Sequence, residues 1–290
     1  MIKKLILGTV QLGLNYGINN SSGKPSLEKA FKILHTAYDN ELRILDTAEA
    51  YGDSQEVIGE FQKQNPNKKF KIITKLSANR SFENINLIDL ISEDCKILNT
   101  DKLYGYMFHN YQSFKENESL YESLLLAKEN GLIEKAGISL YSNIELIDII
   151  ENYTGFDLIQ IPFNLFDNAL KRRAVLEKAK AKGVEIHTRS AFLQGVFFMQ
   201  VKKLPLKLHQ LLKELNSLNS LKKKYDINTE TLALKYALEK QYIDNVLIGV
   251  DTVGQLLSNI EISKSTQVIP HELVDRIDIK EEKLLNPSNW

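Results

Sequence analysis

Short apolar runs alternate with longer segments of helical periodicity along the whole of this chain. Eight apolar runs lie at residues 5–8, 43–46, 70–75, 103–109, 134–139, 157–163, 184–190 and 245–250. Strands that alternate with helices pair in parallel, because each crossover returns the chain to the same end of the sheet. Eight such units within 290 residues favour a closed (β/α)₈ TIM barrel, with an open doubly wound sheet as the structural alternative.

The segments between these runs predict the helices of the barrel. Helices are expected near residues 26–40, 54–65, 84–98, 116–130, 143–153, 169–182 and 252–264, and a long irregular stretch followed by further helices is expected after residue 190. No change of composition marks a linker, so residues 1–290 are predicted to form a single domain. The first strand begins at residue 5, and we therefore expect no N-terminal hairpin across the base of the barrel.

Composition excludes several classes of partner. The chain has 37 basic and 37 acidic residues, whereas nucleic acids and anionic membranes attract a surplus of Lys and Arg. No apolar run approaches the length of a membrane span, and the N-terminus lacks the features of a secretory signal. Cys95 is the single cysteine, which predicts a reducing cytoplasm. The glycines of residues 8–17 fit neither GxGxxG nor GxxxxGK.

Ionisable residues end or follow three neighbouring strands of the predicted barrel. Asp46 ends the second strand and Tyr51 follows it, Lys75 ends the third strand, and His109 ends the fourth. Taken alone, Asp46 and Tyr51 are also compatible with ordinary turn chemistry. Active sites of this fold lie at the carboxyl ends of the strands, so the four side chains are predicted to meet there. Burying such a set without a functional reason would be costly.

The predicted cluster has the composition of a proton donor for a carbonyl oxygen. An ammonium beside a phenol is expected to lower the pKa of the tyrosine below its free value of about 10. Asp46 would keep Lys75 charged and in place, and a neutral His109 would orient a substrate oxygen. A carbonyl that accepts a proton and a hydride becomes an alcohol, and the hydride requires a cofactor because no side chain supplies one.

These residues resemble the catalytic tetrad of the aldo-keto reductases. The segment LDTAEAYGDSQEVIG (residues 45–59) resembles the family signature around Asp46 and Tyr51, FKIITK carries Lys75, and YMFHN carries His109. The resemblance extends from residue 7 to about residue 260. It implies a (β/α)₈ barrel and an NAD(P)H-dependent oxidoreductase that reduces an aldehyde or ketone, with Tyr51 as proton donor. A sugar-derived carbonyl is the suggested substrate.

The resemblance also implies a cofactor site across the mouth of the barrel. The residues that match it are Gly8, Thr9, Ser139, Gln160, Arg189, Ser190, Leu193, Gly195, Gly249, Asp251, Thr252, Gln255 and Asn259. Several positions depart from the family pattern. Arg189 replaces a stacking tyrosine, and Gln255 stands where many members have a basic residue for the 2′-phosphate. We expect NADP(H), with NAD(H) left open because Asp251 could hydrogen-bond a free 2′-hydroxyl.

Other readings of the same residues stay open at this point. Lys75 could form the Schiff base of a barrel aldolase, and a cofactor-binding regulatory subunit could keep this scaffold with little turnover. His187, on the seventh strand, is most simply structural. No histidine pair has metal-ligand spacing, so no metal is expected. Tyr16 and Phe163 are candidate substrate-binding residues. The expected partner is a small-molecule carbonyl compound, and the expected state is a monomer or weak homo-oligomer.

Overall fold

Eight parallel strands close into a barrel. The structure is a computed structural model that describes residues 1–18, 20, 23–80 and 85–290. The strands are β1 (Leu5–Gly8), β2 (Ile44–Asp46), β3 (Lys71–Leu76), β4 (Leu103–Phe108), β5 (Ile133–Ser139), β6 (Leu158–Pro162), β7 (Glu185–Arg189) and β8 (Asn245–Gly249). Each strand pairs in parallel with the next, and β8 pairs with β1 to complete the closed order. The predicted TIM barrel is therefore confirmed.

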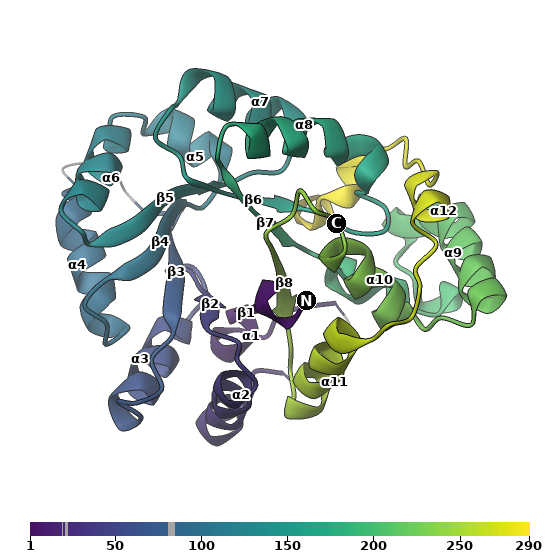
Figure 1. Cartoon of the computed structure of the whole chain (residues 1–290), viewed down its shortest axis with the longest axis horizontal. Coiled ribbons are helices and arrows are strands. Elements are labelled where there is room, and N and C mark those ends of the chain that lie inside the picture. The colour runs from purple at the N-terminus through teal and green to yellow at the C-terminus, as the bar shows by residue number, and fades with distance from the viewer. Residues whose placement is uncertain (19, 21–22, 81–84) are drawn as a thin grey trace.

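Helices surround the barrel, as Figure 1 shows. They are α1 (Val10–Gly13), α2 (Leu27–Asp39), α3 (Ser54–Gln64), α4 (Leu87–Ile97), α5 (Tyr111–Glu116), α6 (Leu120–Glu129), α7 (Asn143–Asn152), α8 (Ala169–Ala181), α9 (Leu212–Tyr225), α10 (Thr229–Leu238), α11 (Val253–Lys264) and α12 (His271–Asp275). Shorter 3₁₀ turns are η1 (Ile2–Lys4), η2 (Leu193–Phe198), η3 (Val201–Lys203), η4 (Leu206–Leu211), η5 (Glu282–Leu285) and η6 (Pro287–Asn289). The helices that periodicity predicts agree with these bounds to within a few residues.

Local chemistry explains where several helices begin and end. Ser142 accepts a hydrogen bond from the Glu145 amide, and the Glu145 carboxylate accepts one from the Ser142 amide, which completes a capping box at the start of α7. Gly131 and Gly183 follow α6 and α8 with φ of 75° and 83°, a backbone conformation that glycine adopts without strain. These residues fix the start of α7 and the ends of α6 and α8.

The apolar core has two layers. Within the barrel, Ile6, Ile73, Met107, Leu158 and Leu247 pack against one another. A much larger cluster lies between the outer faces of the strands and the surrounding helices. Both faces of each strand are thus covered, which is why the strands of a parallel sheet read as continuous apolar runs rather than as alternating patterns.

A polar network lies at the amino ends of the strands, opposite the carboxyl ends. Glu185 accepts hydrogen bonds from the Tyr104 hydroxyl at 3.0 Å and from Lys135 at 2.9 Å. His187 lies 2.5 Å from the same carboxylate, and Asn245 contacts the His187 ring at 2.9 Å. His187 is therefore part of a structural network at the other end of the barrel from the predicted tetrad.

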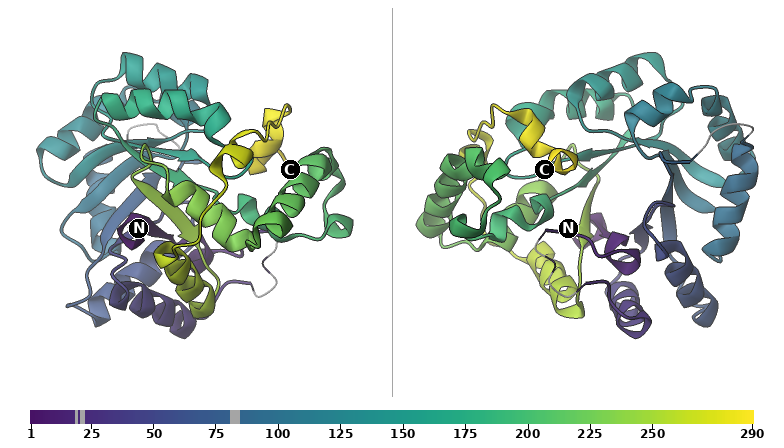
Figure 2. Two further views of the ribbon diagram at one scale, coloured as in Figure 1. Left: turned by 45° about the vertical axis from the view of Figure 1, so that its right-hand side comes forward. Right: turned by 180° about the vertical axis from the view of Figure 1, so that it is seen from behind.

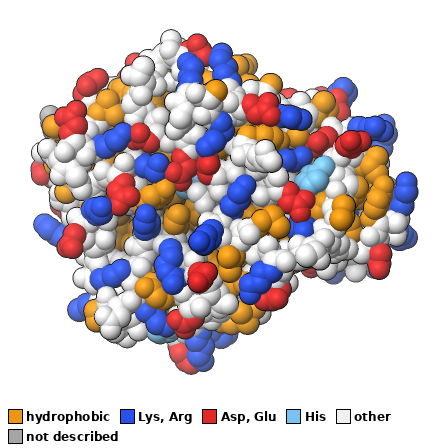
Figure 3. Space-filling model, viewed as in Figure 1, with side chains coloured by type: hydrophobic (Ala, Val, Ile, Leu, Met, Phe, Trp, Pro, Cys, Tyr) orange, Lys and Arg blue, Asp and Glu red, His pale blue; other side chains and the backbone are white. Residues whose placement is uncertain are grey.

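The C-terminal segment packs beside the helices that follow β7. Figure 2 shows the yellow C-terminal region against the green helices α9 and α10. The Asn168 side chain donates to the carbonyls of Val274 and Ile277 at 2.9 and 2.8 Å, which ties this segment to the start of α8. No helix in the described part of the chain is both long and apolar enough to cross a membrane. On the face shown in Figure 3, acidic and basic side chains are interspersed.

Candidate active site

A cavity of about 900 Å³ opens at the carboxyl ends of the strands. Most of the residues that the sequence predicts for the site line it. They are Gly8, Thr9, Tyr16, Asp46, Tyr51, His109, Ser139, Gln160, Arg189, Ser190, Gly195, Gly249, Asp251, Gln255 and Asn259. Residues spread over more than 250 positions of the chain therefore come together at one end of the barrel, because parallel strands present all their carboxyl ends at the same edge.

A buried ion pair lies at the floor of this cavity. Lys75 donates to Asp46 Oδ1 at 2.6 Å and to the Thr47 carbonyl at 2.9 Å, and the two charged side chains are only 1% and 2% exposed. Gln160 donates to the other carboxylate oxygen of Asp46 at 2.7 Å. The hydrogen bonds of Asp46 are thereby shared between a cation and an amide, which is the arrangement that makes a buried carboxylate tolerable.

The two remaining members of the predicted tetrad lie next to this pair. Lys75 Nζ lies 5.1 Å from the centroid of the Tyr51 ring. The ring of His109 meets that of Tyr51 edge to face, with centroids 5.7 Å apart and planes at 81°. Asp46, Tyr51, Lys75 and His109 therefore form one contiguous cluster, as the strand-end argument predicts.

Burial dominates the protonation of this cluster. Burial, followed by the charge of Asp46, raises the pKa of Tyr51 above its ordinary value, although Arg189 acts in the opposite direction. The expectation that the pKa of Tyr51 lies below its ordinary value is therefore wrong in direction for the protein without bound ligands. Desolvation of the phenolate outweighs its attraction to Lys75, because that cation is already paired with Asp46. Burial also lowers the pKa of Lys75.

His109 is neutral at physiological pH. Burial, with contributions from Lys75 and Arg189, lowers the pKa of His109 to about 3. A neutral imidazole offers one donor and one acceptor nitrogen, so it can hydrogen-bond an uncharged substrate oxygen. This agrees with the role that the sequence predicts for it.

The depressed pKa of His109 predicts a pH dependence of stability. The unfolded chain binds a proton at this residue below about pH 6.5, whereas the folded protein does so only near pH 3. The contribution of His109 to folding is therefore complete above about pH 6.5 and falls steadily as the pH drops towards 3. We expect His109→Gln to lose less stability than wild type between pH 7 and pH 5, measured by urea unfolding. Equal losses in the two proteins would contradict the assigned pKa. The buried Asp94, whose pKa burial raises to about 7, is present in both and cancels in the comparison.

Two glycines fix the loop that carries Tyr51. A Cβ on Gly13 would lie 1.7 Å from the Tyr51 carbonyl oxygen, and a Cβ on Gly52 would lie 2.4 Å from the Gly13 carbonyl oxygen. Gly52 also has a φ of 59°. The end of α1 and the loop after β2 thus touch backbone to backbone, which only glycine permits. Ser54 strengthens the contact by donating to Thr9 Oγ1 at 2.8 Å.

The remainder of the cavity has features suited to an extended polar ligand. Gly8 and Gly249, at the ends of β1 and β8, line it without side chains. Gln11 Oε1 is buried and has no hydrogen-bond partner among the described residues, and this side chain lies where a Cβ on Gly249 would be. The backbone after β7 is left-handed at Ser190 and Gln194, with φ of 63° and 50°. Left-handed non-glycine residues concentrate at functional sites.

Two hydrogen bonds join residues that line the cavity but lie far apart in the sequence. Gln194 donates to the Tyr16 hydroxyl at 2.9 Å, and Asn20 donates to Asp251 Oδ1 at 3.2 Å. The loop after β1 is thereby joined both to the loop after β7 and to the start of α11. Thr252 does not line the cavity: it caps α11 by accepting from the Gln255 amide at 3.2 Å.

Besides Thr252 and the buried Lys75, two predicted site residues do not line the cavity. Phe163 is fully buried and stacks on Tyr236 of α10, with centroids 5.4 Å apart and planes at 8°. Leu193 is also fully buried in the apolar core. Neither side chain is placed to contact a ligand in the cavity, because packing against the surrounding helices takes both away from the barrel mouth. The predicted substrate role of the Phe163 side chain is not supported by this position.

Further residues that line the cavity are not among the predicted site residues. They are Val10, Gln11, Gly17, Asn20, Ala50, Ala78, Asn79, Asn110, Tyr141, Ala191, Phe192, Gln194, Phe198, Glu230, Leu247, Ser258 and Pro287. Most belong to loops, whose paths depend on tertiary contacts.

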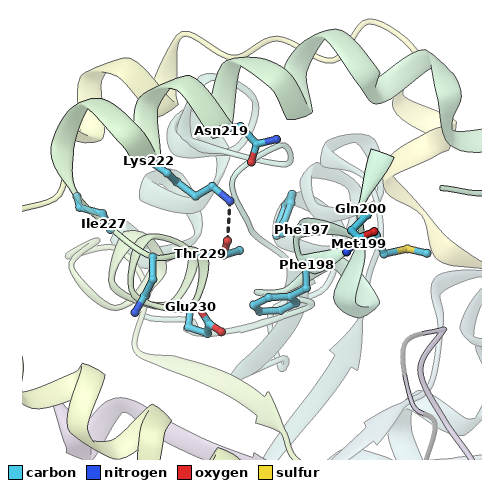
Figure 4. Close-up of a pocket in the computed structure, with 10 residues that line it drawn as sticks. Phe197, Phe198, Met199, Gln200, Asn219, Lys222, Ile227, Thr229 and Glu230 are labelled. Carbon is cyan, nitrogen blue, oxygen red and sulfur yellow. Dashed lines mark hydrogen bonds between the residues drawn. The ribbon is translucent and has the colours of Figure 1, made fainter. Parts of the chain in front are cut away.

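A second cavity of about 450 Å³ lies between η2 and the helices α9 and α10 (Figure 4). It shares Phe198 and Glu230 with the first, and Lys222 donates to Thr229 Oγ1 at 2.7 Å within it.

Comparison with known proteins agrees with this architecture. The model of the aldo/keto reductase family matches residues 4–282. The chain belongs to the aldo/keto reductase family. An aldo-keto reductase from Bacillus halodurans in its holo form is similar, with a TM-score of 0.73 and 17% identity over 97% of this chain and 95% of the other. A Pseudomonas aeruginosa protein described as an aldo-keto reductase has a TM-score of 0.66 and 20% identity over 90% of this chain and 89% of its own. Likeness at these identities shows the shared fold, and membership of the family implies carbonyl reduction with a nicotinamide cofactor.

Proposed function

We propose that this aldo-keto reductase reduces an aldehyde or ketone to an alcohol, with Tyr51 as the proton donor. The observation that supports it is the contiguous cluster of Asp46, Tyr51, Lys75 and His109 on the cavity. Reduction adds a hydride to the carbonyl carbon and a proton to the carbonyl oxygen. The reduced nicotinamide cofactor supplies the hydride when it is bound, and the chain supplies the proton.

The protonation states of the cluster suit this role. Because burial raises the pKa of Tyr51, its phenol keeps its proton at neutral pH and has one to give. The proton passes to the carbonyl oxygen as negative charge develops there, and the resulting phenolate lies beside the Lys75–Asp46 pair. Neutral His109 would hold the substrate oxygen by a hydrogen bond. Solvent then restores the proton of Tyr51.

The same geometry disfavours the aldolase reading of Lys75. A Schiff base needs an accessible, unprotonated amine. Lys75 is 1% exposed and hydrogen-bonded to both Asp46 and the Thr47 carbonyl, and it does not line the cavity.

The alternative of a regulatory subunit differs from the enzyme in turnover alone. Single-turnover oxidation of the bound reduced cofactor by a reactive aldehyde would separate the two, and the absence of any oxidation would favour the regulatory subunit.

We further propose that the cofactor lies along the cavity, held near its nicotinamide by Ser139 and Gln160. The loop after β7 and the start of α11 would cover the rest, with Ser190, Gly195 and Asn259 among the contacts. The orphaned oxygen of Gln11 offers an acceptor in the same cavity. One domain over residues 1–290, a cytoplasmic location and a monomeric or weakly associated state remain predictions from the sequence.

The charges of the cavity bear on which nicotinamide cofactor binds. The resemblance predicts NADP(H) and leaves NAD(H) open. A 2′-phosphate is normally held by Arg or Lys. Among the described residues that line the cavity, Arg189 is the only Lys or Arg, whereas Asp251 and Glu230 are acidic. Asp251 and Gln255 adjoin each other at the start of α11, with Gln255 Oε1 accepting from the Asp251 amide. We therefore favour NAD(H), the alternative that the sequence left open.

This choice predicts a measurable preference. NADH should bind more tightly than NADPH, because Asp251 repels a phosphate and can accept a hydrogen bond from a ribose hydroxyl. The combined change Asp251→Ser and Gln255→Arg should move the ratio of affinities towards NADPH by about tenfold or more, the worth of one charge-assisted hydrogen bond. Fluorescence titration of both proteins with both cofactors measures it. Tighter binding of NADPH by wild type would restore the original assignment.

A further inference from the structure

Arg189 places a positive charge on the cavity that the proposed chemistry does not use. It ends β7 and is paired across the sheet with Pro162, the last residue of β6. It is the only Lys or Arg among the described residues that line the cavity. Its guanidinium lies over the Tyr141 ring, 4.1 Å from the centroid, and donates one hydrogen bond to the Leu140 carbonyl at 3.1 Å. The side chain is thus held in place from one side.

The guanidinium has no acidic partner within the described chain. A carboxylate would have to lie within salt-bridge distance, and none of the described ones does. Asp46 is already bonded to Lys75 and Gln160, and Asp251 accepts from Asn20. Arginine carries several N–H donors, and one of them has a protein acceptor here. A partly buried, permanently charged group with unused donors is suited to bind an anion.

The charge lies close to the catalytic cluster. The positive charge of Arg189 acts on the pKa values of Tyr51, Lys75 and His109, lowering each. Arg189, Tyr51 and His109 also line the same cavity. An anion held by the guanidinium would therefore lie close to the carbonyl that Tyr51 protonates, within reach of the same small molecule.

We infer that Arg189 binds an anionic group of the substrate, and that the substrate is a carbonyl compound bearing a carboxylate or a phosphate. This inference rests on the proposed reductase function. The planar guanidinium matches both groups because it can form two parallel hydrogen bonds to either. Arg189 replaces a stacking tyrosine of the family, and stacking of the guanidinium face on the cofactor would leave its N–H edge available. The two roles are therefore compatible.

Matched substrate pairs test the inference. Turnover by wild type should be compared between 4-carboxybenzaldehyde and its methyl ester, and between glyceraldehyde 3-phosphate and glyceraldehyde. We expect kcat/KM to favour the charged member of at least one pair by about tenfold to a hundredfold, the worth of a hydrogen-bonded charge. The pair with the larger ratio identifies carboxylate or phosphate as the natural group. Arg189→Met should bring that ratio close to one, and Arg189→Lys should retain part of it.

Binding measurements keep the test informative if Arg189→Met has no turnover. Calorimetric titration with 4-(hydroxymethyl)benzoate and its methyl ester compares product-like ligands directly, and Arg189→Met should lose the preference for the acid. Arg173→Met removes an equal charge from an exposed pair with Glu177 and should keep the preference.

Equal kcat/KM for the charged and neutral substrates of each pair in wild type would overturn the inference while leaving carbonyl reduction established. The inference would also be overturned if Arg189→Met kept the preference for the charged substrate and bound NADH more weakly. That result would assign the guanidinium to the cofactor. No reduction of any aldehyde would instead refute the proposed function.

Discussion

Tyr51→Phe is expected to lower the turnover number by about 10²- to 10⁴-fold, the usual contribution of general acid catalysis. The change removes the transferable proton and leaves the ring and its edge-to-face contact with His109 in place. Cofactor affinity should change little, because the hydroxyl is expected to contact the substrate oxygen. Steady-state kinetics with a reactive aldehyde and fluorescence titration with the cofactor measure the two quantities.

Tyr38→Phe is a matched control for that experiment. It removes a hydroxyl whose hydrogen bond goes to the Asn67 carbonyl at 3.1 Å, at the surface, and it should keep the wild-type turnover. A Tyr51→Phe protein that reduces its substrate at near the wild-type rate would remove Tyr51 from the mechanism. Asp46 and Tyr51 would then be explained by their turn geometry.

Lys75→Met is expected to reduce both turnover and stability. The substitution leaves Asp46 buried with Gln160 as its remaining side-chain partner, and breaking a buried ion pair from one side costs about 3–5 kcal/mol. Urea unfolding should show this as a lower midpoint. The double variant Asp46→Asn, Lys75→Met removes both charges and should recover part of the loss. An unchanged midpoint for Lys75→Met would show that Asp46 finds other compensation.

The combined variant Tyr51→Phe, Lys75→Met tests whether the two residues act through one proton. Their effects on turnover should then be far from additive. Additive losses would mean that Lys75 contributes by a route other than Tyr51, such as positioning Asp46 and Gln160. Turnover of the two single variants and the double variant, measured with one aldehyde, completes this cycle.

The positions of the tetrad could be predicted because they follow from strand order alone. Asp46, Lys75 and His109 each end or follow a strand, and parallel strands bring their carboxyl ends together whatever the loops do. The direction of the Tyr51 pKa shift could not be predicted in this way. Counting neighbouring charges omits desolvation, and desolvation depends on how fully the surrounding side chains enclose the phenol.

Residues beyond the strand ends were harder to place. Phe163 follows β6 directly, where a side chain could face either the cavity or the helices, and its stacking on Tyr236 decides between them. The short helices α1 and α5 are too brief for periodicity to reveal. The hydrogen bonds that link Tyr16 with Gln194 and Asn20 with Asp251 join positions that no local pattern relates.

The contact between Gly13 and Gly52 has a consequence for how such a protein can vary. A methyl group on Gly13 would overlap the backbone of Tyr51, and one on Gly52 would overlap the backbone of Gly13, so neither position accepts a larger residue. A change in the loop after β1 that shifts α1 would carry the backbone of Tyr51 with it. Replacing the loop after β1 with one from another protein, in order to change the substrate, would therefore succeed only if α1 and the loop that carries Tyr51 were replaced together.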